Sequence, residues 1–200
     1  MFFACSAFGQ DQEITGWSEY KFGDSFDSVL SKSKGKIDDR PCQIDQVKRG
    51  FEQQGIYCKL INTEQLQLGG LEWNGTFTFS NKNKDLIKIG LRLNDPINIE
   101  NTSEKLIEKF RQKYGSGKLV DESFPADYCE KLVSRRNRGE RTTRYDENFF
   151  PIRKTYTINQ KYGSIIISNK LQRACDNPEI SIRSLEVEYL QLQQVSNNNL

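Results

Sequence analysis

The segment from Leu71 to Leu93 constrains the fold of this chain more than any other part of its sequence. Two runs in it alternate apolar and polar side chains, with turn-forming residues between them at 81–85. The apolar positions are Leu71, Trp73, Phe77 and Phe79 in the first run and Ile87, Ile89, Leu91 and Leu93 in the second. Because successive side chains in a β-strand point to opposite faces, each run predicts a strand with one apolar face. Together they predict a β-hairpin in an antiparallel sheet with one packed face and one face in water.

Further strands are predicted on both sides of this hairpin. They cover residues 56–61, 66–68, 154–159, 162–168 and 179–192. In the last of them the apolar residues change from even positions (Ile180, Ile182) to odd positions from Leu185 onward. Such a change of parity predicts a β-bulge near Arg183 and Ser184.

Four helices are predicted from capping residues and from apolar residues spaced three and four apart. They cover residues 24–35, 44–55, 101–115 and 126–138. Asp24 and Asn101 are the expected N-caps of the first and third helices. In the fourth helix we expect Leu132 and Val133 to point inward, and residues 116–124 are predicted to be a connector.

This order of elements predicts the α+β class: an antiparallel sheet with helices packed on one face. Residues 10–98 and 99–195 each pass from a capped helix to antiparallel strands. This shared order predicts two divergent repeats within one domain. The alternative is two unrelated halves of similar topology. We expect the Asn-rich tail at 196–200 to be frayed.

The first nine residues are apolar and end in Ala7-Phe8-Gly9, which has the small-residue spacing of a signal-peptidase site. We expect residues 1–9 to be the remnant of a signal peptide, with ordinary buried chain as the alternative. Beyond them, no apolar stretch approaches the roughly 20 residues that cross a bilayer. The sequence therefore predicts a periplasmic or secreted protein without a transmembrane segment.

Cysteine usage agrees with export. Removal of Cys5 would leave an even number of cysteines, which can pair completely in an oxidising compartment. These are Cys42, Cys58, Cys129 and Cys175. Of the three connectivities, pairing Cys42 with Cys58 and Cys129 with Cys175 is favoured, because each bridge then closes within one half of the chain. Four free thiols in a cytosolic protein are the alternative.

The chain contains no histidine. This excludes Ser-His-Asp and Cys-His catalysis, and without a CxxC pair it also disfavours zinc binding, so we expect no cofactor and no metal. Paired carboxylates remain as candidate acids and bases. They are Asp24 with Asp27, Asp38 with Asp39, and Asp146 with Glu147. Helix capping or a polar turn explains each pair without catalysis.

An arginine-rich segment is the main candidate for binding. It holds five arginines within ten positions: Arg135, Arg136, Arg138, Arg141 and Arg144. Guanidinium groups match carboxylates in a bidentate manner, so an acidic surface of another protein is the expected target. A solvated helix end whose arginines pair with nearby acids such as Glu140 is the alternative. Trp17 and Tyr20, near the start, are candidate aromatic anchors.

Nucleic acid is not an expected partner. The formal net charge is only +2, and most aromatic residues alternate as core-facing strand positions.

Three segments carry a family resemblance. They are Gly16-Trp17 followed by residues 22–29, residues 106–115, and Leu185-Glu186-Val187-Glu188-Tyr189. These segments are similar to those of small bacterial envelope proteins with a β-lactamase-inhibitor-protein-like fold. The resemblance implies helices on one face of an antiparallel sheet, residence in the periplasm, and a role in gripping another protein. It carries over no catalytic residue.

The sequence as a whole favours an exported, non-catalytic protein-binding module of the inhibitor or immunity type. Two alternatives remain open: a small carbohydrate-active hydrolase that uses paired carboxylates, and a protein that binds envelope polyanions through its arginines.

Overall fold

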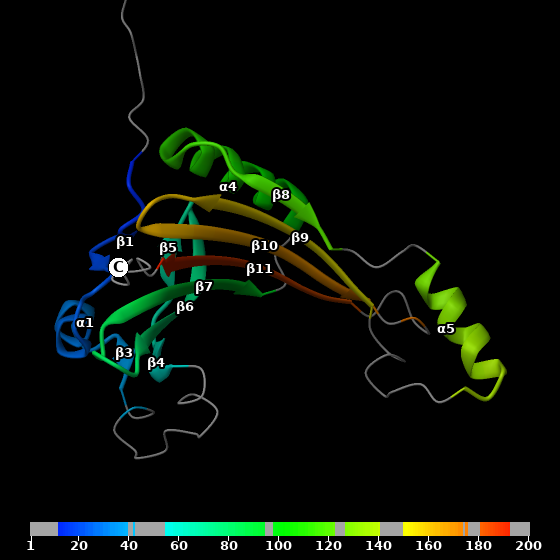
Figure 1. Cartoon of the computed structure of the whole chain (residues 1–200), viewed down its shortest axis with the longest axis horizontal. Helices are drawn as coiled ribbons and strands as arrows, with labels where there is room; N and C mark the ends of the chain where they lie inside the picture. The colour runs from blue at the N-terminus through cyan, green and yellow to red at the C-terminus, as the bar shows by residue number, and fades with distance from the viewer. Residues whose placement is uncertain are drawn as a thin grey trace, which may run out of the picture.

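The computed structural model describes residues 12–39, 42, 55–94, 98–122, 127–140, 150–173, 175 and 181–192. Within these residues, one antiparallel sheet dominates the fold and three helices lie beside it (Figure 1). The α+β class predicted from the sequence is therefore confirmed. The leader at 1–9, the tail at 196–200 and all but the last residue of the predicted helix at 44–55 lie outside the described part.

The described strands form a nine-stranded sheet in the order β3-β4-β6-β7-β11-β10-β9-β8, with β5 paired to β6. Their bounds are β3 Ile37–Asp38, β4 Ile56–Asn62, β5 Leu66–Leu68, β6 Leu71–Ser80, β7 Leu86–Asn94, β8 Lys118–Asp121, β9 Phe150–Asn159, β10 Gly163–Arg173 and β11 Ser181–Gln191. A separate ribbon pairs β1 (Gly16–Trp17) with β2 (Tyr20–Lys21). The hairpin predicted from alternation is β6–β7. The predicted connector at 116–124 is wrong, because β8 forms there and pairs with β9.

One face of the sheet carries the core. A row of directly paired residues crosses six strands, and each is at most 1% exposed. The row is Leu60, Phe77, Ile89, Tyr189, Ile165 and Ile158. The opposite face carries charged residues such as Lys88 and Glu188, which form an ion pair. The sheet therefore has the packed face and the wet face that the alternation predicted.

Two details of strand register differ from the prediction. In β7 the pairing shifts so that Lys88 lies opposite Thr78 but Leu86 lies opposite Phe79, which leaves Ile87 as an extra residue. Leu86 therefore takes the fully buried position that the alternation had given to Ile87. The predicted bulge near Arg183 is wrong, because β11 pairs with β10 without a shift and Ile182 lies on the solvent side, 52% exposed.

Helix α1 (Phe26–Ser33) lies at one end of the sheet. Ser25 is its N-cap, since its hydroxyl accepts from the Ser28 amide, so the prediction of Asp24 as the cap is wrong. Asp24 instead accepts from the Lys21 amide at 2.7 Å and from the Lys32 ammonium at 2.6 Å. The ring of Phe26 packs edge-on against Phe79 at 5.4 Å between centroids.

Helix α4 (Ile99–Tyr114) contacts β10 and β11 through a stripe of buried side chains. The largest of these are Ile99, Leu106, Phe110 and Tyr114. The helix ends at Gly115, as predicted, but it begins earlier than predicted because Asn98 is the N-cap. The side chain of Asn98 accepts from the amide of Asn101, the residue that the sequence predicted as the cap.

Helix α5 (Tyr128–Asn137) stands beyond the ends of β9 and β10, apart from the main core (Figure 1). Leu132 is buried, but Val133 is 51% exposed, so the prediction that both point inward is wrong for Val133. A helix that packs on few neighbours buries a narrow stripe, and adjacent positions then cannot both face inward.

The side-chain amide of Gln160 joins three parts of the chain. Its carbonyl accepts from the Ile14 amide at 2.7 Å, and its NH₂ group donates to the carbonyls of Gln12 at 3.0 Å and Tyr114 at 2.9 Å. The last of these bonds satisfies a carbonyl at the end of α4 that has no partner within the helix. Gln160 therefore fixes the segment that leads into β1 against the end of α4.

We predict that Gln160→Ala lowers the free energy of unfolding by about 1–3 kcal/mol, because it removes three hydrogen bonds and leaves partly buried groups unpaired. Urea titration followed by circular dichroism measures the change. Gln112→Ala is the matched control, since the exposed Gln112 donates only to Glu108, and it is expected to change stability by less than about 0.5 kcal/mol. Equal effects of the two substitutions would contradict the role given to Gln160.

Candidate functional site

Arg135 of α5 and Arg138, which directly follows the helix, converge on one carboxylate. Arg135 Nε donates to one oxygen of Glu140 at 3.0 Å, and Arg138 Nε donates to the other at 2.9 Å. These bonds, that to Arg138 first and that to Arg135 second, hold the pKa of Glu140 below its usual value. The geometry shows two guanidinium groups placed to bind a single carboxylate from both sides.

The structure does not describe the side chains of the other predicted arginines. The side chain of Arg136, and all of Arg141 and Arg144, lie outside the described residues. The described pair is exposed, so its contact with Glu140 is of the kind that contributes little to stability. An incoming carboxylate could therefore displace Glu140 at small cost.

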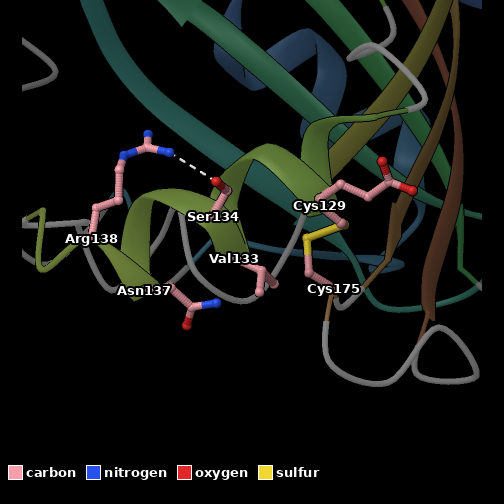
Figure 2. Close-up of a pocket in the computed structure, with 7 residues that line it drawn as sticks. Cys129, Val133, Ser134, Asn137, Arg138 and Cys175 are labelled. Atoms are coloured by element: carbon pink, nitrogen blue, oxygen red, sulfur yellow. Dashed lines mark hydrogen bonds between the residues drawn. A yellow bond between two sulfur atoms is a disulfide. The ribbon is translucent and has the colours of Figure 1, made fainter.

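A pocket of about 700 Å³ lies beside these arginines, where a disulfide joins Cys129 of α5 to Cys175 (Figure 2). Glu130, Val133 and Asn137 of α5 line it together with Arg138, which directly follows the helix, and the Arg138 guanidinium donates to the Ser134 hydroxyl at 2.8 Å. The pocket thus combines an apolar wall with an amide, a carboxylate near the disulfide and a cation at the other end. This mixture suits the edge of a protein contact.

The two described disulfides join the pairs favoured from the sequence. Cys42 bonds to Cys58 and Cys129 bonds to Cys175, with Cα atoms 5.6 Å and 5.2 Å apart. Cys58 lies in the core, whereas Cys175 attaches α5 to the chain just after β10. The first bridge therefore supports the core and the second one positions α5.

The two candidate aromatic anchors have different environments. Tyr20 is 5% exposed and its ring packs on Phe77 at 4.6 Å, so it is a core residue and the prediction that it anchors a partner is wrong. Trp17 is half-buried and lines a second pocket with Phe110 and Tyr189. The β1–β2 ribbon explains the difference, since it directs Tyr20 to the sheet and leaves Trp17 at the edge of the core.

The pocket beside Trp17 includes two lysines that were not predicted as binding residues. Lys109 and Lys113 line it from α4, one turn apart. Their signal in the sequence was the i, i+4 spacing beside the apolar stripe of Leu106 and Phe110. Lysines at such positions are usually solvated, and these two are singled out only because they line the same pocket as Trp17.

Asp24 and the two glutamates of one groove on α4 do not have the arrangement of a catalytic pair, and the predicted pair Asp146 and Glu147 lies outside the described residues. Asp24 is bonded to the Lys21 amide and to Lys32, as its capping neighbourhood implies. Glu104 and Glu108 both line a groove of about 570 Å³, but they project from the same helix at i and i+4. Glycoside hydrolysis needs two carboxyl groups that flank the scissile bond. One helix face cannot supply that arrangement.

Ion pairs cross the strands on the wet face of the sheet. Lys88 pairs with Glu188, and Glu186 pairs with both Lys170 and Arg92. These cross-strand pairs place two carboxylates among three cations. The polyanion alternative, which depends on the arginine-rich segment, stays a prediction.

Comparison with known protein families, with curated proteins and with solved structures finds no significant match to this chain. Among the described residues, none of the helices has both the length and the apolar character needed to span a bilayer.

The two disulfides are predicted to act on different parts of the fold. Cys129→Ser/Cys175→Ser should release α5, so that its amides exchange rapidly with deuterium while those of β6 and β7 stay protected. Cys42→Ser/Cys58→Ser should instead lower the global free energy of unfolding by about 2–4 kcal/mol, because it reaches the core. Hydrogen exchange measured by mass spectrometry compares the two variants. Loss of protection throughout the sheet in the first variant would contradict this division.

Stability is predicted to fall at alkaline pH. Burial, and then the neighbouring Tyr114, raise the pKa of Tyr189 above its usual value. A group whose pKa is raised on folding stabilises the protein below its unfolded pKa, near 10 for tyrosine, and that contribution is lost as the pH rises further.

Tyr189→Phe removes this titration. Melting temperatures measured between pH 8 and pH 11.5 should therefore fall less steeply above pH 10 for this variant than for the unmodified protein. Tyr57→Phe, at a half-buried position of β4 where the ring keeps its contacts with Phe26 and Lys84, is the control, and its profile should follow that of the unmodified protein. A profile for Tyr189→Phe identical to that of the unmodified protein would rule out this cause.

Proposed function

We propose that this chain is an exported, non-catalytic protein that binds an acidic surface of another protein, as an inhibitor or an immunity protein does. The contact surface is the end of α5, defined by Val133, Arg135, Asn137 and Arg138. The observation that carries the proposal is the convergence of Arg135 and Arg138 on the two oxygens of Glu140. Glu140 occupies the place that a carboxylate of the partner would take.

The chemistry of this surface suits a protein partner. Arginine is enriched at the centres of interfaces because its flat guanidinium pairs with carboxylates and also packs on apolar surface. Among the described residues, the two Nη groups of Arg135 have no hydrogen-bond partner. The exposed side chain of Val133 lines the same pocket as Arg138 and adds an apolar contact there.

The disulfide at the start of α5 supports the same role. It holds Cys129 to Cys175, so the helix stays in place without packing on the main core. A surface that is already ordered loses little conformational entropy on binding. Two disulfides are also compatible with a periplasmic or secreted protein, and export is part of the proposal.

Two finer features of the fold belong to the proposal as well: helices on one face of the sheet, and two divergent repeats at 10–98 and 99–195. Support for the first is that side chains of α1 and α4 join the same core cluster as the inner face of the sheet. Support for the second is that α4 begins at Ile99.

The test compares three variants for binding to a partner captured from the envelope or extracellular fraction, purified, and titrated by calorimetry. Arg135→Ala/Arg138→Ala should weaken binding about tenfold or more, because it removes both partners of the carboxylate. Glu140→Gln should strengthen binding, because it removes an internal competitor. Arg111→Ala is the control, since exposed Arg111 on α4 also pairs with a glutamate, Glu108, at 3.6 Å, and it should have no effect.

Two outcomes would overturn the proposal. The first is a captured protein that binds all three variants equally. The second is retention of the chain on heparin beads at 150 mM salt with no protein captured, which would favour the polyanion alternative.

A further inference from the structure

A cavity of about 380 Å³ lies at the end of the sheet opposite α5, where β1, β5 and the carboxyl-terminal half of α4 come together (Figure 1). Trp17, Leu68 and Phe110 line it, and Tyr189 of the central core row faces it. The pocket is open to solvent at its rim, and its volume lies in the range of small-molecule sites.

The lining combines aromatic and apolar side chains with two cations and no acid. Lys109 and Lys113 belong to it, and the other polar side chains in it, Ser18 and Gln67, are uncharged. Lys109 forms no ion pair with any described residue. Lys113 Nζ lies 4.9 Å from the centroid of the Tyr114 ring, so a cation–π contact holds it over the aromatic wall. The site thus offers an apolar interior and a cationic rim.

The walls are fixed before any ligand arrives. The indole of Trp73, fully buried in β6, donates to the Leu68 carbonyl at 3.0 Å and so holds the β5 side. Gly69, in the turn after β5, has φ +65°, and a Cβ there would lie 3.2 Å from Leu106 Cδ2 of α4. The turn therefore packs directly against the helix.

The segment that carries Trp17 is held separately. The side-chain amide of Gln160 bonds to Gln12, Ile14 and the Tyr114 carbonyl, which ties this segment to the end of α4. A preformed cavity avoids the cost of ordering its walls on binding.

We propose that this cavity binds a small amphipathic carboxylate, with its apolar body against Trp17, Phe110 and Tyr189 and its carboxylate between Lys109 and Lys113. An uncharged ligand would leave the lysines without a counter-charge, and a cationic ligand would be repelled by them. A carboxylate pairs with two ammonium groups while its hydrocarbon part replaces water against the aromatic wall. The site is separate from the α5 surface, so it does not depend on the proposed partner contact.

The test titrates the full chain with sodium decanoate and, in a second arm, with indole-3-acetate, which distinguishes an aliphatic from an aromatic body. Calorimetry gives the affinity, and tryptophan fluorescence reports the site, since Trp17 lines the cavity while Trp73 is fully buried. We expect saturable binding of at least one carboxylate with one site per chain. Decanol, which has the same chain length but no charge, should bind about tenfold more weakly than decanoate.

Lys109→Met/Lys113→Met removes the charges and keeps the long apolar stems of both side chains. This variant should bind the carboxylate about tenfold more weakly while its melting temperature without ligand stays unchanged. Lys105→Met is the matched control, because Lys105 is exposed one turn earlier on α4 and does not line the cavity, and it should bind normally. Trp17→Ala should weaken binding and remove the fluorescence change.

The proposal fails if neither carboxylate binds saturably to the folded chain. It also fails if decanol binds as tightly as decanoate, or if the double lysine variant binds decanoate as tightly as the Lys105→Met control.

Discussion

The register of six strands around one apolar row is the constraint on which the rest of the structure depends. The row is Leu60, Phe77, Ile89, Tyr189, Ile165 and Ile158, from β4 across to β9. A slip of one residue in any of these strands would exchange its buried and exposed faces, and in β11 it would carry Glu188 into the core. Extra residues at Tyr57 and Ile87, on the two strands beside Phe79, keep both neighbours of β6 in phase with the row.

This row also determines where ligands can approach. Its inner side is covered by α4 over β10 and β11, where Tyr189 also lines the pocket beside Trp17. Its reverse side is a polar face on which Glu186 and Glu188 pair with two lysines and an arginine. The cations that we assign to binding lie away from the sheet: Lys109 and Lys113 on α4, Arg135 on α5, and Arg138 directly after α5.

The two ends of the molecule are rigid for different reasons. At the Trp17 end, the three hydrogen bonds of Gln160 hold the entering chain to α4, and the Cys42–Cys58 bridge braces the strands nearby. At the other end, α5 lies outside the main core and the Cys129–Cys175 bridge holds it. Packing holds the Trp17 end in place because the core extends to it. The α5 end has no such packing, so a covalent bond holds it instead. Both arrangements reduce the entropy lost when a ligand or a partner binds.

Alternation of apolar residues, a glycine after an apolar stripe and the spacing of the cysteines are local signals. From them the sequence predicted the β6–β7 hairpin and the end of α4 at Gly115, and it favoured the observed pairing of the four described cysteines among three possibilities. It did not reveal β8, because all four of its residues are exposed and an edge strand shows no alternation of burial. It also placed Ile87 in the core, because a bulge depends on the neighbouring strand and not on the run in which it lies.

The candidate sites divide in the same way. Arginine density marked Arg135 and Arg138, and an aromatic cluster marked Trp17, since composition alone reveals both. That Tyr20 is buried while Trp17 meets Lys109 and Lys113 was decided only by the tertiary structure, which brings β1, β5 and α4 together across more than 90 residues of sequence. The physical reason is that neighbouring residues are enough to show the period of a strand or a helix. Contacts between distant side chains depend instead on which strands pair and in what register.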